Sequence, residues 1–130
     1  ELLLHSIKTI AIMPNDVVNY PDDSFENMKI FSDKYNFNFP YVYDENQEIA
    51  KAYRAACTPD FFLYDNERKL VYRGQYDSSR PKNSTPITGE DIRRAAEAVL
   101  NEEIIPEKQL PSMGCNIKWK KGFEPDYFFS

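Results

Sequence analysis

The sequence predicts an α/β domain, and three observations lead to this class. Residues 7–13 are β-branched and almost continuously apolar, which is typical of a strand buried on both faces of a sheet. Two short β-rich runs at 61–64 and 70–73 are separated by a polar loop, which indicates an antiparallel hairpin. Apolar residues at helical spacing then follow over residues 92–100. Strands that alternate with helices favour a layered α/β sheet over a β-sandwich.

The first half of the chain contains two further predicted helices. A helix is predicted over 24–35, with Asp23 as its N-cap and Glu26 three residues later, a capping-box spacing. A short strand at 41–43 comes next. A shorter helix is predicted around 46–54, with Ile49 and Tyr53 on one face.

The second half begins where Thr58-Pro59 breaks that helix and leads into the hairpin. Residues 75–88 are polar and contain proline, so we expect a loop. Arg73, Asp77 and Arg80, at and after the end of the hairpin, could bind an anion or anchor the tail by ion pairs, and we favour the anchoring role. Thr88 is the predicted N-cap of the last helix, because Asp91 follows three residues later. The apolar stripe of this helix consists of Ile92, Ala95, Ala96, Val99 and Leu100.

Two parts are predicted along the chain: a domain over 1–103 and an extended tail over 104–130. The tail holds three prolines and the single tryptophan but no long periodic element. We expect Trp119 and the aromatic run 127–129 to dock on the domain, because they would otherwise form an exposed apolar patch that favours aggregation.

Composition excludes several classes of protein. A length of 130 residues supports one domain, and the abundant aromatic residues can build a core. The formal charge of −5 argues against nucleic acid as a partner. No apolar run approaches the ~20 residues of a membrane span. Two cysteines cannot make a disulfide-dense scaffold, and no Cys/His spacing fits a metal, the only histidine being His5.

Four motifs in order carry a resemblance to a known family. They are AACTPDFFLYD at 55–65, LVYRGQYDSSRP at 70–81, PITGED at 86–91 and GCNIKWK at 114–120. From about residue 7 to 126, the chain resembles the peroxiredoxin-like, AhpC/TSA-type thioredoxin family proteins of bacteria. The resemblance implies a thioredoxin-like three-layer fold, in which helices flank a central mixed β-sheet.

The chain departs from that family at its N-terminus. Members carry a strand and helix with redox cysteines in a CxxC-type motif, and this sequence has no CxxC. We therefore expect an N-terminally truncated domain whose sheet lacks a central strand. Three alternatives stay open: a fragment of a longer protein, a rearranged sheet, or a second copy that fills the gap. Under the last two, the strands at 7–13 and 61–64 pair directly or across a homodimer.

The resemblance implies redox chemistry. The expected function is that of a thiol-disulfide oxidoreductase or peroxiredoxin-like antioxidant protein, acting in the cytoplasm on a thiol or disulfide protein or on a peroxide. We expect no cofactor, metal, nucleic acid or membrane partner, and little activity from this chain alone. The competing hypothesis is a non-catalytic thioredoxin-fold module that binds a partner.

Four residues are candidates for the site. Thr58 and Pro59 correspond to the family's cis-proline loop and are expected to bind substrate through a cis peptide bond. Cys57 is a candidate resolving thiol, against the alternative of a small buried hydrophobe. Cys115 is a candidate that a folded-back tail would bring near the site, against the alternative of packing alone. A disulfide between the two cysteines would need their Cα atoms within ~7 Å.

Overall fold

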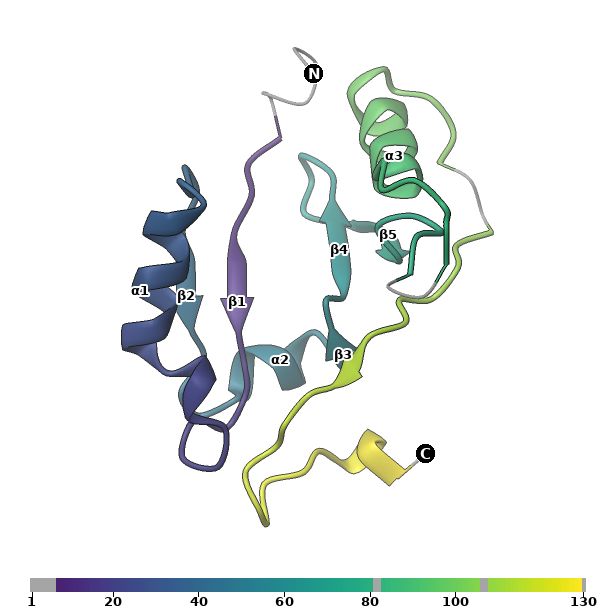
Figure 1. Ribbon diagram of the computed structural model, residues 1–130. Coiled ribbons are helices and arrows are strands. Elements are labelled where there is room, and N and C mark those ends of the chain that lie inside the picture. Colours follow the sequence, from purple (N-terminus) through teal and green to yellow (C-terminus); the bar gives the residue numbers. More distant parts are fainter. Residues whose placement is uncertain (1–6, 81–82, 106–107, 130) are drawn as a thin grey trace. The chain divides into compact units, whose positions relative to one another are not determined.

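The computed structural model describes residues 7–80, 83–105 and 108–129. Within these ranges the chain alternates strands and helices (Figure 1). The helices are α1 (Phe25–Lys34), α2 (Glu48–Ala52) and α3 (Glu90–Leu100), and the strands are β1 (Ala11–Met13), β2 (Tyr41–Tyr43), β3 (Cys57–Thr58), β4 (Phe61–Tyr64), β5 (Leu70–Gly74) and β6 (Cys115–Asn116). Two compact units result: one holds Lys8–Ala56 and the segment from Asn116 onward, and the other holds Ile7 and Cys57–Cys115.

The first unit is built on a parallel pair of strands. β1 pairs with β2 from Ala11 opposite Tyr41 to Met13 opposite Tyr43, and α1 packs beside them (Figure 1). The N-cap of α1 is Ser24, whose Oγ accepts a hydrogen bond from the Asn27 N–H at 3.2 Å. The prediction of Asp23 as N-cap was wrong, because Asp23 already belongs to a separate 3-10 turn over Pro21–Asp23.

Helix α2 is shorter than predicted and buries a different residue. The buried carboxylate of Asp44 accepts hydrogen bonds from the N–H groups of Ile49 at 3.2 Å and Ala50 at 2.8 Å, which fixes the start of the helix. Ile49 and Tyr53, the predicted apolar face, are 39% and 41% exposed, whereas Ala50 is 4% exposed. A helix of five residues has too few turns to bury a whole stripe.

The tail docks on this unit through Trp119 and Tyr127, as expected for these two residues, whereas Phe128 is 45% exposed. Gln47 is fully buried, and its side chain bonds the tail backbone at Lys118 O and Lys120 N, each at 3.0 Å. The Tyr127 hydroxyl donates to the carbonyl of Ala55 at 2.8 Å, and its ring meets Trp119 edge-on at 6.3 Å. Side-chain hydrogen bonds and aromatic packing therefore hold this part of the tail.

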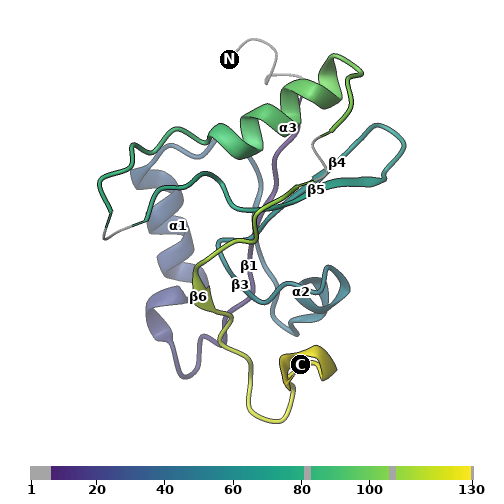
Figure 2. The same ribbon diagram turned by 90° about the vertical axis from the view of Figure 1, so that its right-hand side faces the viewer.

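The second unit is an antiparallel hairpin under a helix. β4 pairs with β5 in a register that sets Phe61 opposite Gly74, as the sequence predicted for a hairpin, and α3 lies over it (Figure 2). The core lies between them. It comprises Leu63, Tyr72, Ala95 and Ala96, with Ile7, Val71, Ile92 and Val99 partly buried against it.

The start of α3 differs from the prediction by one residue. Gly89 is the N-cap, at a φ of 69°, and an added Cβ there would meet the Tyr76 ring at 2.6 Å. Thr88, the predicted cap, precedes it, and its Oγ1 accepts from the Glu90 N–H at 3.2 Å. The threonine thus satisfies an unpaired helix donor from just outside the helix.

Strand pairing in the described residues is divided among three two-stranded sheets, β1–β2, β3–β6 and β4–β5. The strands β1 and β4 belong to different units, and each has one ladder within its own unit, with β2 and with β5. Direct pairing of the segments 7–13 and 61–64 stays a prediction. Pairing across a homodimer stays a prediction.

Candidate functional site

The candidate site is the loop that joins β3 to β4. β3 is hydrogen-bonded to β6, and the Thr58–Pro59 peptide bond that follows it is cis, as expected from the resemblance. We refer to residues Cys57–Asp60 as the Thr58–Pro59 loop. Its side chains and backbone are held by contacts from β5 and from residues 109–115, all within the second unit.

Cys57 is a half-buried thiol inside this loop. Its Sγ lies 3.7 Å from the carbonyl oxygen of Ser112 and 3.8 Å from that of Pro59, so the thiol has two acceptors. Burial, followed by the charge of Asp60, raises the pKa of the Cys57 thiol, and these effects exceed the opposing ones of Gly114 and Arg73. A raised pKa disfavours the thiolate, which is the form of cysteine that acts as a nucleophile.

A buried charge anchors the loop. The side chain of Asp60 is 6% exposed and pairs with Arg73 of β5 at 3.3 Å. The Ser112 hydroxyl lies 2.9 Å from the second carboxylate oxygen of Asp60 and 2.6 Å from the carbonyl oxygen of Gly74. Asp60 is thus neutralised and hydrogen-bonded, as a buried carboxylate must be.

Gly114 lets the tail approach the loop closely. A Cβ added to this glycine would collide with the carbonyl oxygen of Thr58 and would crowd the nitrogen of Pro59 at 3.2 Å. Sequence reasoning placed Gly114 in a motif without this role. Asp60 and Ser112 were missed altogether, because a contact between residues 52 apart leaves no periodic signal in a sequence.

Both cysteines are free thiols in this structure. Cys115 is exposed and follows Gly114 directly, so the tail does bring it to the strand that pairs with β3. The redox activity of Cys57 and Cys115 and a disulfide between them stay predictions. His5 lies outside the described residues.

The polar loop after β5 is a hydrogen-bonded network that holds the start of α3, and the hydrogen bonds that Asp77 and Arg80 make in it are not the expected ion pairs to the tail. The buried carboxylate of Asp77 accepts from the N–H groups of Thr88 at 2.7 Å and Gly89 at 2.6 Å, and also from Ser79. These hydrogen bonds, with that of the Ser79 side chain first, lower the pKa of Asp77. Arg80 donates to Gln75 Oε1 at 2.6 Å within the same loop.

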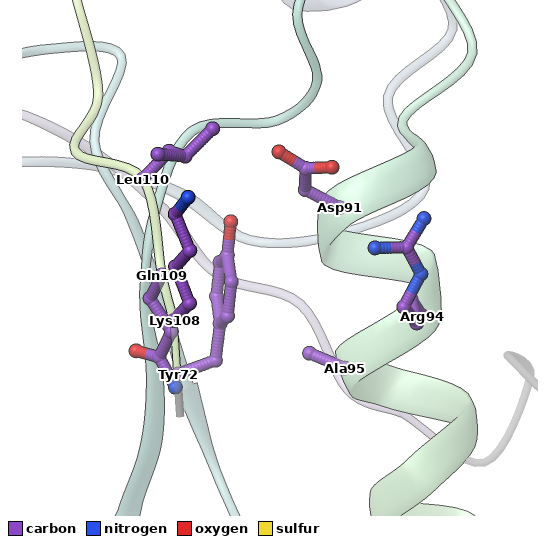
Figure 3. Close-up of a pocket in the computed structure, with 7 residues that line it drawn as sticks. All are labelled: Tyr72, Asp91, Arg94, Ala95, Lys108, Gln109 and Leu110. Atoms are coloured by element: carbon purple, nitrogen blue, oxygen red, sulfur yellow. The ribbon is translucent and has the colours of Figure 1, made fainter. Parts of the chain in front are cut away.

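A pocket of about 360 Å³ lies between α3, β5 and residues 108–110 (Figure 3). Three of its lining side chains have partners in the protein: Gln75 donates to Asp91 at 2.6 Å, Arg94 pairs with Glu90 at 2.6 Å, and Gln109 donates to the Val71 carbonyl at 2.9 Å.

Among residues 7–80, 83–105 and 108–129, no cluster of three or more His, Cys, Asp or Glu side chains could hold a metal ion. No helix in the same ranges has both the length and the apolar character to cross a bilayer.

These features define a mixed α/β protein with a half-buried thiol beside a Thr-Pro loop. The AhpC/TSA family model matches residues 6–73, more than half of the chain, and the chain belongs to this family. The match includes Cys57, Thr58 and Pro59. No curated protein matches the chain significantly.

Two solved structures are similar to this chain. One is an uncharacterized conserved protein from Geobacillus kaustophilus, 56% identical with a TM-score of 0.86. The other is a hypothetical protein from Sinorhizobium meliloti, 49% identical with a TM-score of 0.87. Each match covers 88% of this chain, but 61% and 63% of the respective structures, so the chain spans about three fifths of their length.

Proposed function

We propose that the whole protein is a thiol-disulfide oxidoreductase or a peroxiredoxin-like antioxidant protein with a thioredoxin-like fold. The observation that carries this proposal is the AhpC/TSA match, which includes the Thr58–Pro59 loop. Thr58 and Pro59 are the proposed substrate-binding residues. The cytoplasmic location belongs to the same proposal.

The chemistry requires a thiolate. With a peroxide, the thiolate sulfur attacks one oxygen, the O–O bond breaks, and the products are a sulfenic acid and water or an alcohol. With a disulfide, the thiolate attacks one sulfur, a mixed disulfide forms, and the other sulfur leaves as a thiolate that a proton neutralises. A dithiol reductant returns the oxidised cysteine to its thiol.

Cys57 is poorly suited to begin either reaction. Its raised pKa disfavours the thiolate. The nearby carbonyl oxygens of Ser112 and Pro59 are hydrogen-bond acceptors for the thiol and are not bases that remove its proton. We therefore assign Cys57 and Cys115 secondary redox roles, as resolving or modulating thiols, and expect this chain alone to be inactive. The attacking thiolate then belongs to another cysteine of the whole protein.

A non-catalytic binding module is the second candidate. The observation that favours it is the same raised pKa of Cys57, because it disfavours the thiolate that the redox chemistry requires. In this case the Thr58–Pro59 loop binds a partner without chemistry.

The test compares the whole protein, its Cys57→Ser variant and the 130-residue chain in parallel. Consumption of hydrogen peroxide and reduction of a small disulfide are measured with dithiothreitol as reductant. We expect activity from the whole protein, a decrease of less than about tenfold in Cys57→Ser, and none from the chain alone. Activity of the chain that disappears in Cys57→Ser would make Cys57 the nucleophile. An inactive whole protein would support the binding module.

A further inference from the structure

One stretch of the tail runs along the outer edge of β5. We call residues Gln109–Cys115 the cover segment. The Gln109 side chain accepts from the Arg73 N–H at 3.0 Å and donates to the Val71 carbonyl at 2.9 Å, so one side-chain amide takes the place of a strand. The Gln75 N–H then donates to the Leu110 carbonyl at 2.9 Å.

The same segment continues onto the Thr58–Pro59 loop. The Ser112 hydroxyl contacts Asp60 and Gly74, and the Ser112 carbonyl accepts from the Cys57 thiol. Gly114 lies so close to the Thr58 carbonyl that no side chain fits between them. At the end of the segment, β6 is hydrogen-bonded to β3. The backbone edge of Cys57 and Thr58 is thus already paired.

An edge that is paired with one strand cannot pair with another until the first one leaves. Extended peptides bind sheet edges through main-chain hydrogen bonds, and a covered edge removes that mode of binding. A small molecule needs no such ladder and is not excluded in this way.

We propose that the cover segment sets substrate specificity by closing the Thr58–Pro59 loop to extended peptides, with Ser112 and Gly114 as its specificity-determining residues. The inference rests on the proposed function and specifies its substrate class. Small disulfides or peroxides react, whereas protein disulfides are excluded as long as the cover segment stays bound to the loop. Ser112 holds the segment in place by the hydrogen bond of its one hydroxyl proton, for which Asp60 and the Gly74 carbonyl are the two acceptors. Gly114 holds the segment in place by leaving room for the Thr58 carbonyl.

The test uses two substrates of the same chemistry but different size, 2-hydroxyethyl disulfide and insulin, with the whole protein and dithiothreitol. In each turnover two protein thiols become a disulfide as the substrate disulfide becomes two thiols, and dithiothreitol restores the protein thiols. The variants are Gly114→Ala, which collides with Thr58, and Ser112→Ala, which loses the hydroxyl contacts. Gly122→Ala is the control for backbone strain elsewhere in the tail: a Cβ there meets no atom within 4 Å, but the φ of +85° disfavours any side chain.

We expect wild type and Gly122→Ala to reduce insulin at least about tenfold more slowly than the small disulfide. In Gly114→Ala and in Ser112→Ala the ratio of the small-disulfide rate to the insulin rate should fall by about tenfold. This is roughly the effect of losing one hydrogen bond that holds the segment in place. They should also speed alkylation of the peptide that carries Cys57, a readout that needs no turnover. Circular dichroism confirms that each variant is folded.

The outcomes separate the two proposals. Equal rates of wild type on insulin and the small disulfide, or unchanged ratios in both variants, would overturn the specificity and leave the function standing. If wild type reduces neither disulfide nor peroxide, the proposed function fails, and the specificity fails with it.

Discussion

At the scale of single residues, Tyr72 shows how one buried polar group couples stability to pH. The residue is 4% exposed in the core beneath α3, and its hydroxyl donates to the Gln75 carbonyl at 2.5 Å. Burial, with a smaller contribution from Asp91 and Asp60, raises its pKa from 10 to about 12. The folded protein therefore holds this proton more tightly than the unfolded chain does.

This linkage predicts the behaviour of Tyr72→Phe at alkaline pH. Because the pKa is raised on folding, the stabilisation is complete below pH 10 and is lost as the pH rises from 10 towards 12. At neutral pH the variant should be less stable by about 1 kcal/mol, the value of a hydrogen bond. Between pH 10 and 12 the difference should shrink and then reverse.

Urea unfolding at pH 8, 10 and 11.5 measures this difference. Tyr20→Phe, which removes the hydroxyl of a tyrosine that is 44% exposed, is the control. A Tyr72→Phe variant whose curve stays parallel to wild type over the whole range would contradict the assignment.

Residue-level features were predictable where the signal is local. The Thr58–Pro59 loop was found because a Thr-Pro dipeptide stands before a hairpin in the sequence. The partners of that loop were not found, because Asp60 meets Ser112 across 52 residues and nothing near either one reports the other. The predicted cap of α1 was Asp23, whereas the structure has Ser24. Both residue types are good caps, and the preceding 3-10 turn, which includes Asp23, decides between them.

At the scale of elements, Gln47 ties the start of α2 to the tail. Its side-chain nitrogen donates to the carbonyls of Pro14 at 2.8 Å and Lys118 at 3.0 Å, and its oxygen accepts from the Lys120 N–H at 3.0 Å. It also has a left-handed backbone, at a φ of 63°. One side chain thus satisfies three backbone groups from two segments.

Gln47→Leu should destabilise this unit by about 3 kcal/mol or more, since three backbone groups lose their partner in a buried place. The fluorescence of Trp119, the single tryptophan, reports unfolding in urea. Gln47→Gly separates the contribution of the side-chain hydrogen bonds from that of the left-handed backbone, because glycine tolerates the positive φ but makes no side-chain bonds. We expect it to be destabilised too. Wild-type stability in Gln47→Gly would show that the hydrogen bonds contribute little.

Elements with a strong local pattern were predicted closely, and elements set by packing were not. The strand at 41–43 and the hairpin have the predicted bounds to within one residue, because turn residues delimit them. The strand predicted over 7–13 pairs only at Ala11–Met13, since its partner strand is three residues long. The apolar pattern gives the character of a strand but not the length of its ladder.

At the scale of the whole molecule, the divided sheets bear on association. In the described part of the chain β1 has one paired neighbour, β2, so no strand of these residues pairs with its other edge. Two-stranded sheets are marginally stable alone, and open edges favour pairing with another chain. We propose on this basis that the 130-residue chain associates with itself.

Ile10→Lys tests this proposal. Ile10 precedes β1 and is 63% exposed, and a lysine beside a strand edge opposes edge-to-edge pairing. Sedimentation velocity over a range of concentrations should show association in wild type and about tenfold weaker association in the variant. Ile104→Lys adds the same charge at a residue that is 92% exposed and outside any strand. Equal effects of both substitutions would point to net charge, and a monomeric wild type would end the proposal.

The α/β class and the family were predictable from the order of elements and motifs. The arrangement of two compact units was not, because each of them joins segments far apart in the sequence. Such contacts depend on which apolar and polar surfaces pack together, and long-range packing leaves no local pattern in a single sequence. The boundary between 1–103 and 104–130 stays a prediction.

The Gln109 side chain, which bonds the edge of β5 in place of a strand, also affects the rate of amide hydrogen exchange there. The amide of Arg73 donates to Gln109, so its shield against solvent is one rotatable side chain and not a neighbouring strand. Rotation of a side chain is far faster than the parting of two strands. Deuterium should therefore enter at Arg73 long before it reaches the amides that β4 and β5 exchange with each other.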